Sequence, residues 1–222
     1  FFIRNMTTIA EELAKHQKTI SISEFFTRNR HLLGFDNPAR ALLMTVKEAV
    51  DNSLDACAEM SVLPEIIVNV SEISENRFKI IVEDNGPGIV KEQIPNIFAK
   101  LLYGSKFHRL RQNRGQQGIG ISASVLYSQL TTGKSTKIIS KIGAKKPAHH
   151  FELKINTKTN DPEIEKDDII DWDKLNGTRI ELELEAKYQK GKQSVDEYIR
   201  QTAIVNPHAA FIYTNPEKEK IE

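Results

Sequence analysis

Residues 37–60, NPARALLMTVKEAVDNSLDACAEM, predict a long helix that begins after Asn37. The Asn37 side chain can cap the helix, and Pro38 costs no hydrogen bond at the first helical position, where the backbone N–H has no partner. At about 100° per residue, the helix over residues 39–60 separates an apolar arc from an acidic one. The apolar arc contains Leu42, Val46, Ala49, Val50, Ser53, Leu54 and Cys57. The acidic arc contains Glu48, Asp51, Asn52, Asp55 and Glu59.

The acidic arc has two interpretations. Most acidic helix faces are solvated surface. Glu48 and Asn52, however, are an i, i+4 pair that points the same way. An amide oxygen can coordinate Mg²⁺ without adding charge, and a carboxylate can take a proton from an activated water. The pair therefore suits a hard cation and a hydrolytic reaction, and two loops further along the chain favour this interpretation.

The first loop is Asp84-Asn85-Gly86-Pro87-Gly88, which follows a predicted central strand over residues 78–83. Its two glycines lack Cβ atoms, so a flat ligand could approach the backbone closely. Asp84, at the end of the strand, could accept a hydrogen bond from an exocyclic amine such as that of adenine. Taken alone, such a sequence is more often only a tight turn.

The second loop is Gly115-Gln116-Gln117-Gly118-Ile119-Gly120, which precedes a predicted helix over residues 121–130. Exposed backbone N–H groups and the positive end of the helix dipole would together cradle phosphates. The glycine spacing is neither that of the dinucleotide fingerprint nor that of a P-loop, so both common nucleotide folds are disfavoured. The basic, glycine-bearing connection over residues 103–114 has the composition of a mobile lid over phosphates.

Alternating apolar residues predict strands in the remaining sequence, and a capping box opens one more helix. The expected elements are a hairpin of residues 66–70 and 78–83, a short helix over 92–102, a hairpin of 137–142 and 149–155, a polar acidic crossing over 161–173, a strand over 178–184, a helix from Ser194 to Val205 and a strand over 209–213.

Length, composition and charge limit the possible classes of protein. A chain of 222 residues, with 39% hydrophobic and 27% charged residues, can form one large or two small globular domains. The 31 basic and 30 acidic residues give a net charge of +1, which is no signature of a nucleic-acid binder. Any contact with DNA must therefore be local or lie outside this chain.

Several features favour a cytoplasmic protein. One cysteine excludes an internal disulfide, and Cys57 on the apolar arc is interpreted as a core residue. No apolar run reaches the roughly 20 residues of a membrane span, and no secretory signal is recognisable. His149 and His150 suggest a metal site, but adjacent strand residues point to opposite faces, so zinc binding is not expected. Residues 1–5 precede Met6 and could be non-native.

Four motifs in order resemble those of the GHKL ATPases, the superfamily of gyrase, Hsp90, MutL and the histidine kinases. They are Glu48-x-x-x-Asn52-x-x-Asp55-Ala56, Asp84-x-Gly86-x-Gly88, Gly115-x-x-Gly118-x-Gly120 and Gly177-Thr178. Each motif alone is weak, but the set in this order is specific. The resemblance implies the Bergerat fold, an α+β two-layer sandwich in which a mixed, mostly antiparallel sheet carries helices on one face and an ATP lid.

Further segments are similar to the B subunits of type IIB DNA topoisomerases, the topoisomerase VI family. They are Ser23-Glu24-Phe25-Phe26, Asn29 to Phe35, Leu102 to Lys106, Leu126-Tyr127-Ser128-Gln129 and Asn206-Pro207-His208-Ala209. The match covers nearly the whole chain from about Ser21. It implies an Mg²⁺-dependent ATPase whose ATP-driven dimerisation gates DNA strand passage.

The resemblance assigns roles to matched positions. Glu48 would polarise the attacking water as the catalytic residue, and Asn52 would hold Mg²⁺. Asp84 would bind the adenine amine, and Thr178 would support it through water. The remaining cofactor-binding residues would be Gly86 and Gly88 beside the base and Ser105, Lys106, Gly115, Gln116, Gln117, Gly118, Ile119, Gly120, Ile121 and Ser122 around the phosphates.

The same resemblance predicts domains and partners. Residues 1–20 would form an N-terminal arm or strap, and residues 21–222 the ATPase domain. The family's transducer domain, which supplies a further lysine to the terminal phosphate, would be missing, so this chain should bind nucleotide but hydrolyse it and dimerise poorly. The expected partners are a DNA-cleaving A subunit, duplex DNA through the full-length protein, and a second copy of the chain in an ATP-dependent homodimer.

Two alternatives remain open at this point. The domain could be an ATP-gated dimerisation module in which hydrolysis only resets the clamp, or it could belong to another GHKL branch of chaperones, mismatch-repair proteins or kinases. The apolar residues between Phe25 and Phe35 could pack on the parent domain or dock on a partner subunit.

Overall fold

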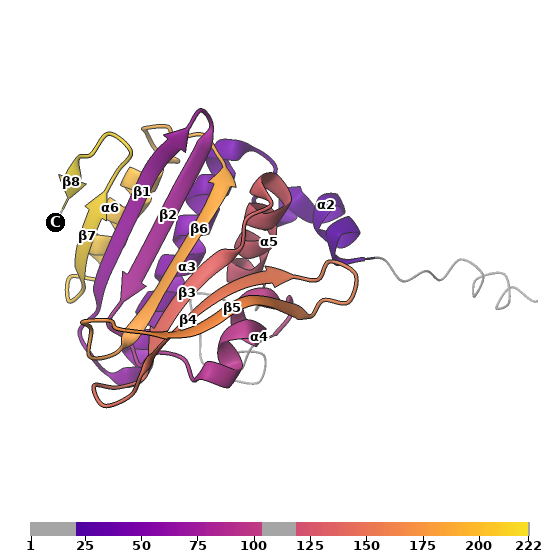
Figure 1. Cartoon of the computed structure of the whole chain (residues 1–222). Coiled ribbons are helices and arrows are strands. Elements are labelled where there is room, and N and C mark those ends of the chain that lie inside the picture. The colour runs from indigo at the N-terminus through magenta and orange to yellow at the C-terminus, as the bar shows by residue number, and fades with distance from the viewer. Residues whose placement is uncertain (1–20, 104–118, 222) are drawn as a thin grey trace, which may run out of the picture.

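The structure is a computed structural model that describes residues 21–103 and 119–221, and its centre is one eight-stranded sheet (Figure 1). The strand order is β5-β4-β3-β6-β2-β1-β7-β8. All neighbouring strands are antiparallel except β1 and β7, which are parallel. The strands are β1 (Glu65–Ser74), β2 (Arg77–Asp84), β3 (Thr136–Lys141), β4 (Ala148–Ile155), β5 (Pro162–Ile170), β6 (Gly177–Glu185), β7 (Ala210–Thr214) and β8 (Lys220–Ile221).

The helices of the described ranges cover one face of this sheet and leave the other face open (Figure 1). They are α2 (Ile22–Leu33), α3 (Pro38–Met60), the short 3-10 helix η1 (Lys91–Gln93), α4 (Ile94–Ala99), α5 (Gly120–Thr132) and α6 (Val195–Val205). This two-layer arrangement confirms the predicted fold class. The part of the chain that the structure describes contains no helix long and apolar enough to cross a membrane.

Helix α3 begins as its sequence predicts. Asn37 is the N-cap, and its Oδ1 accepts a hydrogen bond of 2.8 Å from the backbone N–H of Arg40. Pro38 occupies the first helical position, where its fixed φ suits the helix. The helix ends at Met60, as expected, because Ser61 adopts the left-handed conformation that closes a helix.

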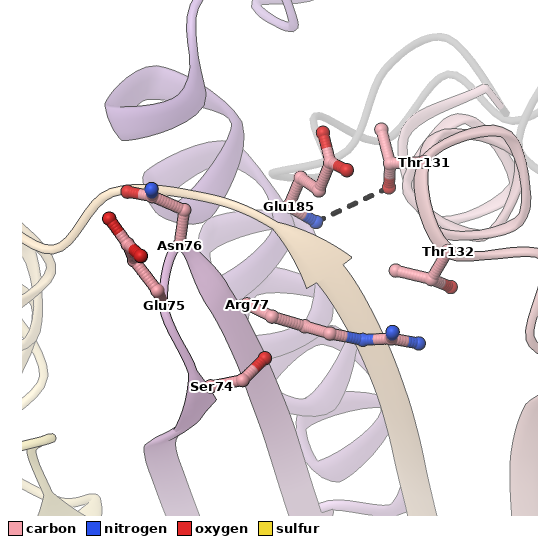
Figure 2. A pocket seen from close by; sticks show the side chains of 7 residues that line it. All are labelled: Ser74, Glu75, Asn76, Arg77, Thr131, Thr132 and Glu185. Carbon is pink, nitrogen blue, oxygen red and sulfur yellow. Dashed lines mark hydrogen bonds between the residues drawn. The ribbon is translucent and has the colours of Figure 1, made fainter.

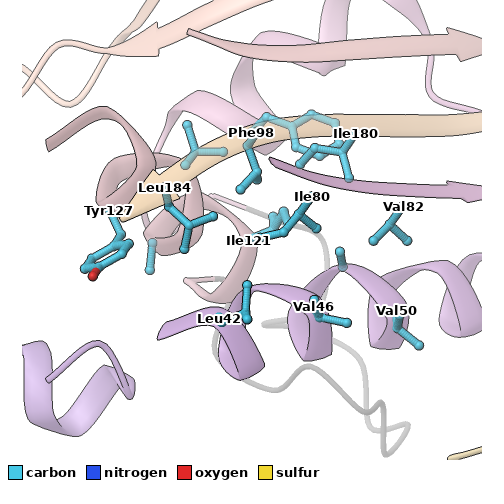
Figure 3. Packing of buried hydrophobic residues seen from close by; sticks show 14 of the residues in the cluster. Leu42, Val46, Val50, Ile80, Val82, Phe98, Ile121, Tyr127, Ile180 and Leu184 are labelled. Atoms are coloured by element: carbon cyan, nitrogen blue, oxygen red, sulfur yellow. The ribbon is translucent and has the colours of Figure 1, made fainter. Parts of the chain in front are cut away.

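The core lies between the sheet and helices α3 and α5 (Figure 3). Leu42, Val46 and Val50 of α3 are each at most 1% exposed and face the inner side chains of β2 and β6. Burial of each such side chain contributes about 1.5–3 kcal/mol relative to exposure. Strand pairing follows the predicted hairpins: β1 with β2, and β3 with β4.

The open face of the sheet is polar because charged residues alternate with the core residues along the central strands. Lys79 pairs with Glu181 at 3.3 Å, and Arg77 pairs with Glu183 at 3.2 Å, in both cases across β2 and β6. These pairs are partly exposed, so each contributes little to stability. Their effect is to keep the uncovered face hydrated.

The sequence predicts a polar crossing over residues 161–173, but these residues contain the edge strand β5. The prediction was wrong because β5 lacks a buried face: residues 163–169 are all exposed, so no hydrophobic alternation marks the strand. A charged edge strand is a common protection against pairing with another chain. A smaller expectation was also wrong, since the helix expected over 92–102 is reduced to η1 and α4.

The acidic arc of α3 is not simply solvated. Asp51 is only 7% exposed and Asp55 only 9%, and α6 packs against α3. Tyr198 of α6 donates a hydrogen bond of 2.9 Å from its Oη to Asp51 Oδ1, and Lys47 pairs with the other oxygen. Asp51 therefore joins two helices, a role that helical periodicity alone could not reveal.

Helix α2 packs on the domain through aromatic contacts. The ring centroids of Phe26 and Phe35 lie 5.7 Å apart, and that of Phe35 lies 5.1 Å from that of Tyr127 in α5. Phe26 and Phe35 are at most 2% exposed. These two residues therefore belong to the parent domain, whereas Leu32 on the same helix is 73% exposed.

Candidate functional site

Asp84 ends β2 in a buried polar site, where its carboxylate receives three hydrogen bonds. Ser53 Oγ of α3 donates to Oδ2 at 2.9 Å, and the backbone N–H groups of Gly86 and Thr178 donate to Oδ1 at 2.9 and 3.2 Å. Asp84 itself is 6% exposed. A carboxylate can accept about four hydrogen bonds, so these three donors leave room for one more from a ligand.

Burial raises the pKa of Asp84 from 3.8 to about 6. The hydrogen bonds from Gly86, Ser53 and Thr178 oppose this change because they stabilise the charged form. The balance leaves a carboxylate that is ionised at neutral pH in a poorly hydrated place. Such a group binds a hydrogen-bond donor more strongly than an exposed carboxylate would.

Of the two glycines after Asp84, Gly88 is required by the protein's own packing and Gly86 is tightly packed. A Cβ on Gly88, whose φ is +70°, would lie 2.2 Å from the carbonyl oxygen of Lys141. A Cβ on Gly86 would lie 3.0 Å from Asp84 Oδ1. The sequence predicts that these glycines make room for a flat ligand, but the close approach of β3 already explains Gly88.

Gly177 approaches the same loop from β6. Its φ is +139°, and a Cβ there would lie 2.1 Å from the carbonyl oxygen of Asp84. This contact brings the following residue, Thr178, within hydrogen-bonding distance of the Asp84 carboxylate. The structure thus joins the second and fourth sequence motifs, although they are 94 residues apart.

Glu48 lies against the start of α5. A Cβ built on Gly120 would lie 1.8 Å from Glu48 Oε2, so the glycine leaves room for the Glu48 side chain in this position. The carboxylate is thereby placed at the positive end of the α5 dipole. Asn52 is one turn further along α3, and both side chains are half-buried. Since Ser53 follows Asn52 and binds Asp84, a single helix connects the Glu48–Asn52 pair to the carboxylate at the end of β2.

The other predicted phosphate-binding residues are placed as follows. Ser122 is 1% exposed and its hydroxyl donates to the backbone oxygen of Ile119 at 3.0 Å, while Ile121 belongs to the core. These two side chains are therefore not available to a ligand, and the start of α5 would bind one through its backbone N–H groups. Six predicted residues lie outside the described residues: Ser105, Lys106, Gly115, Gln116, Gln117 and Gly118.

Two residues of this site were missed by sequence reasoning. Ser53 was assigned to the apolar arc of α3, although a hydroxyl on that arc signals a polar partner in the core. Asn176 precedes the Gly177-Thr178 motif and binds the loop after Asp84 through its side-chain amide. Its position next to a recognised motif was the available signal.

A separate cavity of 410 Å³ lies at the other end of the sheet (Figure 2). Arg77 lines it from the beginning of β2, whereas Asp84 ends the same strand, which places the two about 23 Å apart at 3.3 Å per residue. The cavity carries both acidic and basic side chains. Its lining residues are Ser74, Glu75, Asn76, Arg77, Thr131, Thr132 and Glu185.

Comparisons with known proteins agree with this geometry. The family model described as "Histidine kinase-, DNA gyrase B-, and HSP90-like ATPase" matches residues 41–181. This range includes most of α3, the loop after β2, the start of α5 and the Gly177-Thr178 pair at the start of β6.

The chain is also similar to proteins named as the B subunit of type 2 DNA topoisomerase 6. It is 62% identical over 214 residues to that of Methanococcoides burtonii, with 96% of this chain and 34% of the relative covered. It is 54% identical over 204 residues to that of Archaeoglobus fulgidus, with 91% and 34% covered. The chain thus spans about a third of the length of these relatives.

A solved structure shares the fold. The topoisomerase IV ATP-binding domain of Francisella tularensis, in complex with a small-molecule inhibitor, matches with a TM-score of 0.59 and 20% sequence identity. The match covers 92% of this chain and 55% of that one. With the family model spanning the assembled site, these findings establish that the chain belongs to the histidine kinase-, DNA gyrase B- and HSP90-like ATPases.

Proposed function

We propose that residues 21–222 form a domain that binds ATP in the site between α3, the loop after β2 and the start of α5, and hydrolyses it. The observation that carries this proposal is the buried Asp84 carboxylate, which has three protein donors and room for a fourth. Adenine offers an exocyclic amine that fits this remaining position. Thr178, whose backbone N–H already binds Asp84, would support the base through a water.

Glu48 is the proposed catalytic residue, and its task is to accept a proton from the water that attacks the terminal phosphate. This role is supported by the position of the Glu48 side chain against Gly120 at the start of α5, because helix N-termini bind phosphates and the carboxylate would then lie near them. Positioning and charge neutralisation account for most of the catalysis of phosphoryl transfer, so this fixed placement matters more than unusual reactivity.

The donor set of the site fits Mg²⁺ held together with a nucleotide. No group of three or more His, Cys, Asp or Glu side chains that could hold a metal by itself occurs among residues 21–103 and 119–221. Mg²⁺ usually binds one or two protein oxygens together with phosphates and waters, and it would neutralise charge on the phosphates. The amide oxygen of Asn52 would be its protein ligand. Lys106, Ser105 and the loop from Gly115 to Gly118 are proposed to line the phosphates from outside the described residues.

At the level of the whole protein, we propose the B subunit of a type IIB DNA topoisomerase. This proposal rests on the identity of 62% to a protein of that name, over a third of its length. Its partners would be a DNA-cleaving A subunit, duplex DNA and a second copy of the chain in an ATP-dependent homodimer. Residues 1–20 are proposed as the arm that reaches the second copy.

The test is calorimetric titration with Mg²⁺ and a non-hydrolysable ATP analogue, comparing the wild type with Asp84→Asn. We expect saturable binding that the substitution weakens by about 1–3 kcal/mol, the cost of mispairing a buried polar group. Glu83→Gln is the matched control, because Glu83 is adjacent and 7% exposed but binds Lys174 and Arg179 on the opposite face of the sheet. Equal losses in both variants, or no binding by the wild type, would contradict the proposed site.

A further inference from the structure

Asn176, in the turn before β6, binds the loop that follows Asp84. Its Nδ2 donates to the carbonyl oxygen of Asn85 at 2.9 Å and to that of Gly86 at 2.7 Å. A side-chain amide has two N–H donors, so both are used on consecutive carbonyls of one loop. A pair of this kind fixes the orientation of both peptide groups.

The two residues after Asn176 contact the same loop. Gly177 comes so close to the carbonyl oxygen of Asp84 that a Cβ would lie 2.1 Å from it, and Thr178 donates its N–H to the Asp84 carboxylate. Three consecutive residues, from the turn into the start of β6, thus contact four groups of the loop: the two carbonyls of Asn85 and Gly86, the Asp84 carbonyl and the Asp84 side chain.

Asn85 anchors the loop on its other side. Its Oδ1 accepts the backbone N–H of Glu65 at 2.9 Å, and its Nδ2 donates to the carbonyl oxygen of Leu63 at 3.0 Å. The loop is therefore held between the α3–β1 connection and the turn before β6. Of these two attachments, that of Asn176 lies two residues before Thr178, whose N–H binds the Asp84 carboxylate.

We propose that Asn176 is a positioning residue for base recognition, which sets the Asp84 loop so that the carboxylate meets the exocyclic amine of adenine. This inference rests on the proposed function, because it takes Asp84 as the adenine-binding group. Gly86 donates to Asp84 Oδ1 through its N–H and accepts from Asn176 through its C=O. A shift of this residue would therefore change the direction in which the carboxylate can accept a further hydrogen bond.

The test measures the affinity of the 222-residue chain for two probes, ADP and purine riboside diphosphate, which lacks the exocyclic amine. The ratio of the two affinities isolates recognition of the amine. In the wild type we expect ADP to bind at least tenfold more tightly. Asn176→Ala should reduce this ratio at least threefold and leave the affinity for purine riboside diphosphate within twofold.

The control is Asn215→Ala. Asn215 is 2% exposed, donates to Glu219 Oε2 at 2.7 Å and accepts from the Glu219 N–H at 2.9 Å, at the far edge of the sheet. Its loss should lower the melting temperature without changing the ratio. Asn176→Ser, which keeps one donor, provides a milder variant if the alanine variant does not fold, and its ratio should lie between those of the wild type and alanine.

Two results would overturn the inference. An unchanged ratio in Asn176→Ala and Asn176→Ser, whether or not the affinity for both nucleotides falls, would mean that Asn176 serves only the fold. A wild type that binds both nucleotides equally well would instead show that the amine is not recognised, so the proposed role of Asp84 would fail together with that of Asn176.

Discussion

At Asp84, burial and hydrogen bonding act on the same carboxylate in opposite directions, and burial dominates. Removal from water disfavours the charged form by more than Ser53, Gly86 and Thr178 restore. A site that binds an amine needs the charged form, so the protein holds a carboxylate that is costly when no ligand is bound. Functional sites commonly contain such groups, whose charged form lowers the stability of the fold but is already present before the ligand binds.

This cost predicts a pH dependence of stability. The folded-state pKa of Asp84 is raised from 3.8 to about 6, so the folded protein binds the proton more tightly than the unfolded chain does. The contribution of Asp84 is therefore present below about pH 4 and is lost as the pH rises through 6. At 1.36 kcal/mol per pKa unit, the loss reaches about 3 kcal/mol.

Urea denaturation of the wild type and of Asp84→Asn between pH 4 and pH 7 measures this contribution. The free energy of unfolding of the wild type, relative to that of the variant, should fall by up to about 3 kcal/mol over this range. The comparison cancels the other titrating groups, which the two proteins share. A difference that stays constant with pH would mean that Asp84 keeps its ordinary pKa.

At the scale of elements, long patterns were predictable and short or polar ones were not. The extent of α3 followed from a capped helix with a clear apolar arc, and the β1–β2 hairpin followed from alternation. Strand β5 was missed because it buries no face. The burial of Asp51 was not predicted because α6, whose Tyr198 binds it, is distant in sequence. The periodicity of a local sequence predicts a single helix or strand, but no local pattern predicts contacts between elements that are distant in sequence.

In the candidate site, too, local patterns were predictable and contacts between distant segments were not. Glu48, Asn52 and Asp84 could be proposed as site residues because their residue types have the required chemistry at recognisable spacings. The packing reason for Gly88 could not be predicted, because it depends on a carbonyl of β3 that is 53 positions away in the sequence. Ser53 and Asn176 were missed for a related reason: each acts on Asp84 or its loop from another element.

The contact of α3 with α5 predicts the effect of Gly120→Ala. The new Cβ would meet the end of the Glu48 side chain, which can move, so the fold should survive while the carboxylate is displaced. Displacement by about 1 Å can reduce a rate by about two orders of magnitude, so we expect at least a tenfold lower rate of single-turnover ATP hydrolysis. The affinity for ADP should change by less than about threefold, because Glu48 acts on the terminal phosphate.

Gly143→Ala is the matched control, since a Cβ at Gly143 has no neighbour within 4 Å. Its rate and its affinity for ADP should equal those of the wild type. Undiminished hydrolysis by Gly120→Ala would show that the position of Glu48 beside α5 is not needed for the reaction.

At the scale of the whole molecule, the strand order separates a stable centre from weak edges. β2 and β6 are paired on both sides and buried beneath α3 and α5, whereas β5 and β8 end the sheet. The proposed site is at the ends of the central strands, so its framework is the most protected part of the fold. Sites built on such elements hold their geometry better than sites built on loops alone.

Hydrogen exchange with and without ADP tests this arrangement. Without ligand, amides of β2 and β6 should exchange slowest and those of β5 and β8 fastest, because local opening follows the loss of neighbouring strands. Saturation with ADP at about 100 times its dissociation constant stabilises the folded state by about 2.7 kcal/mol. Beyond this general slowing, additional protection should appear at residues 84–88 and 176–178, and none at residues 74–77, which line the 410 Å³ cavity. Additional protection at residues 74–77 instead would place the nucleotide at the opposite end of the sheet and refute the site built around Asp84.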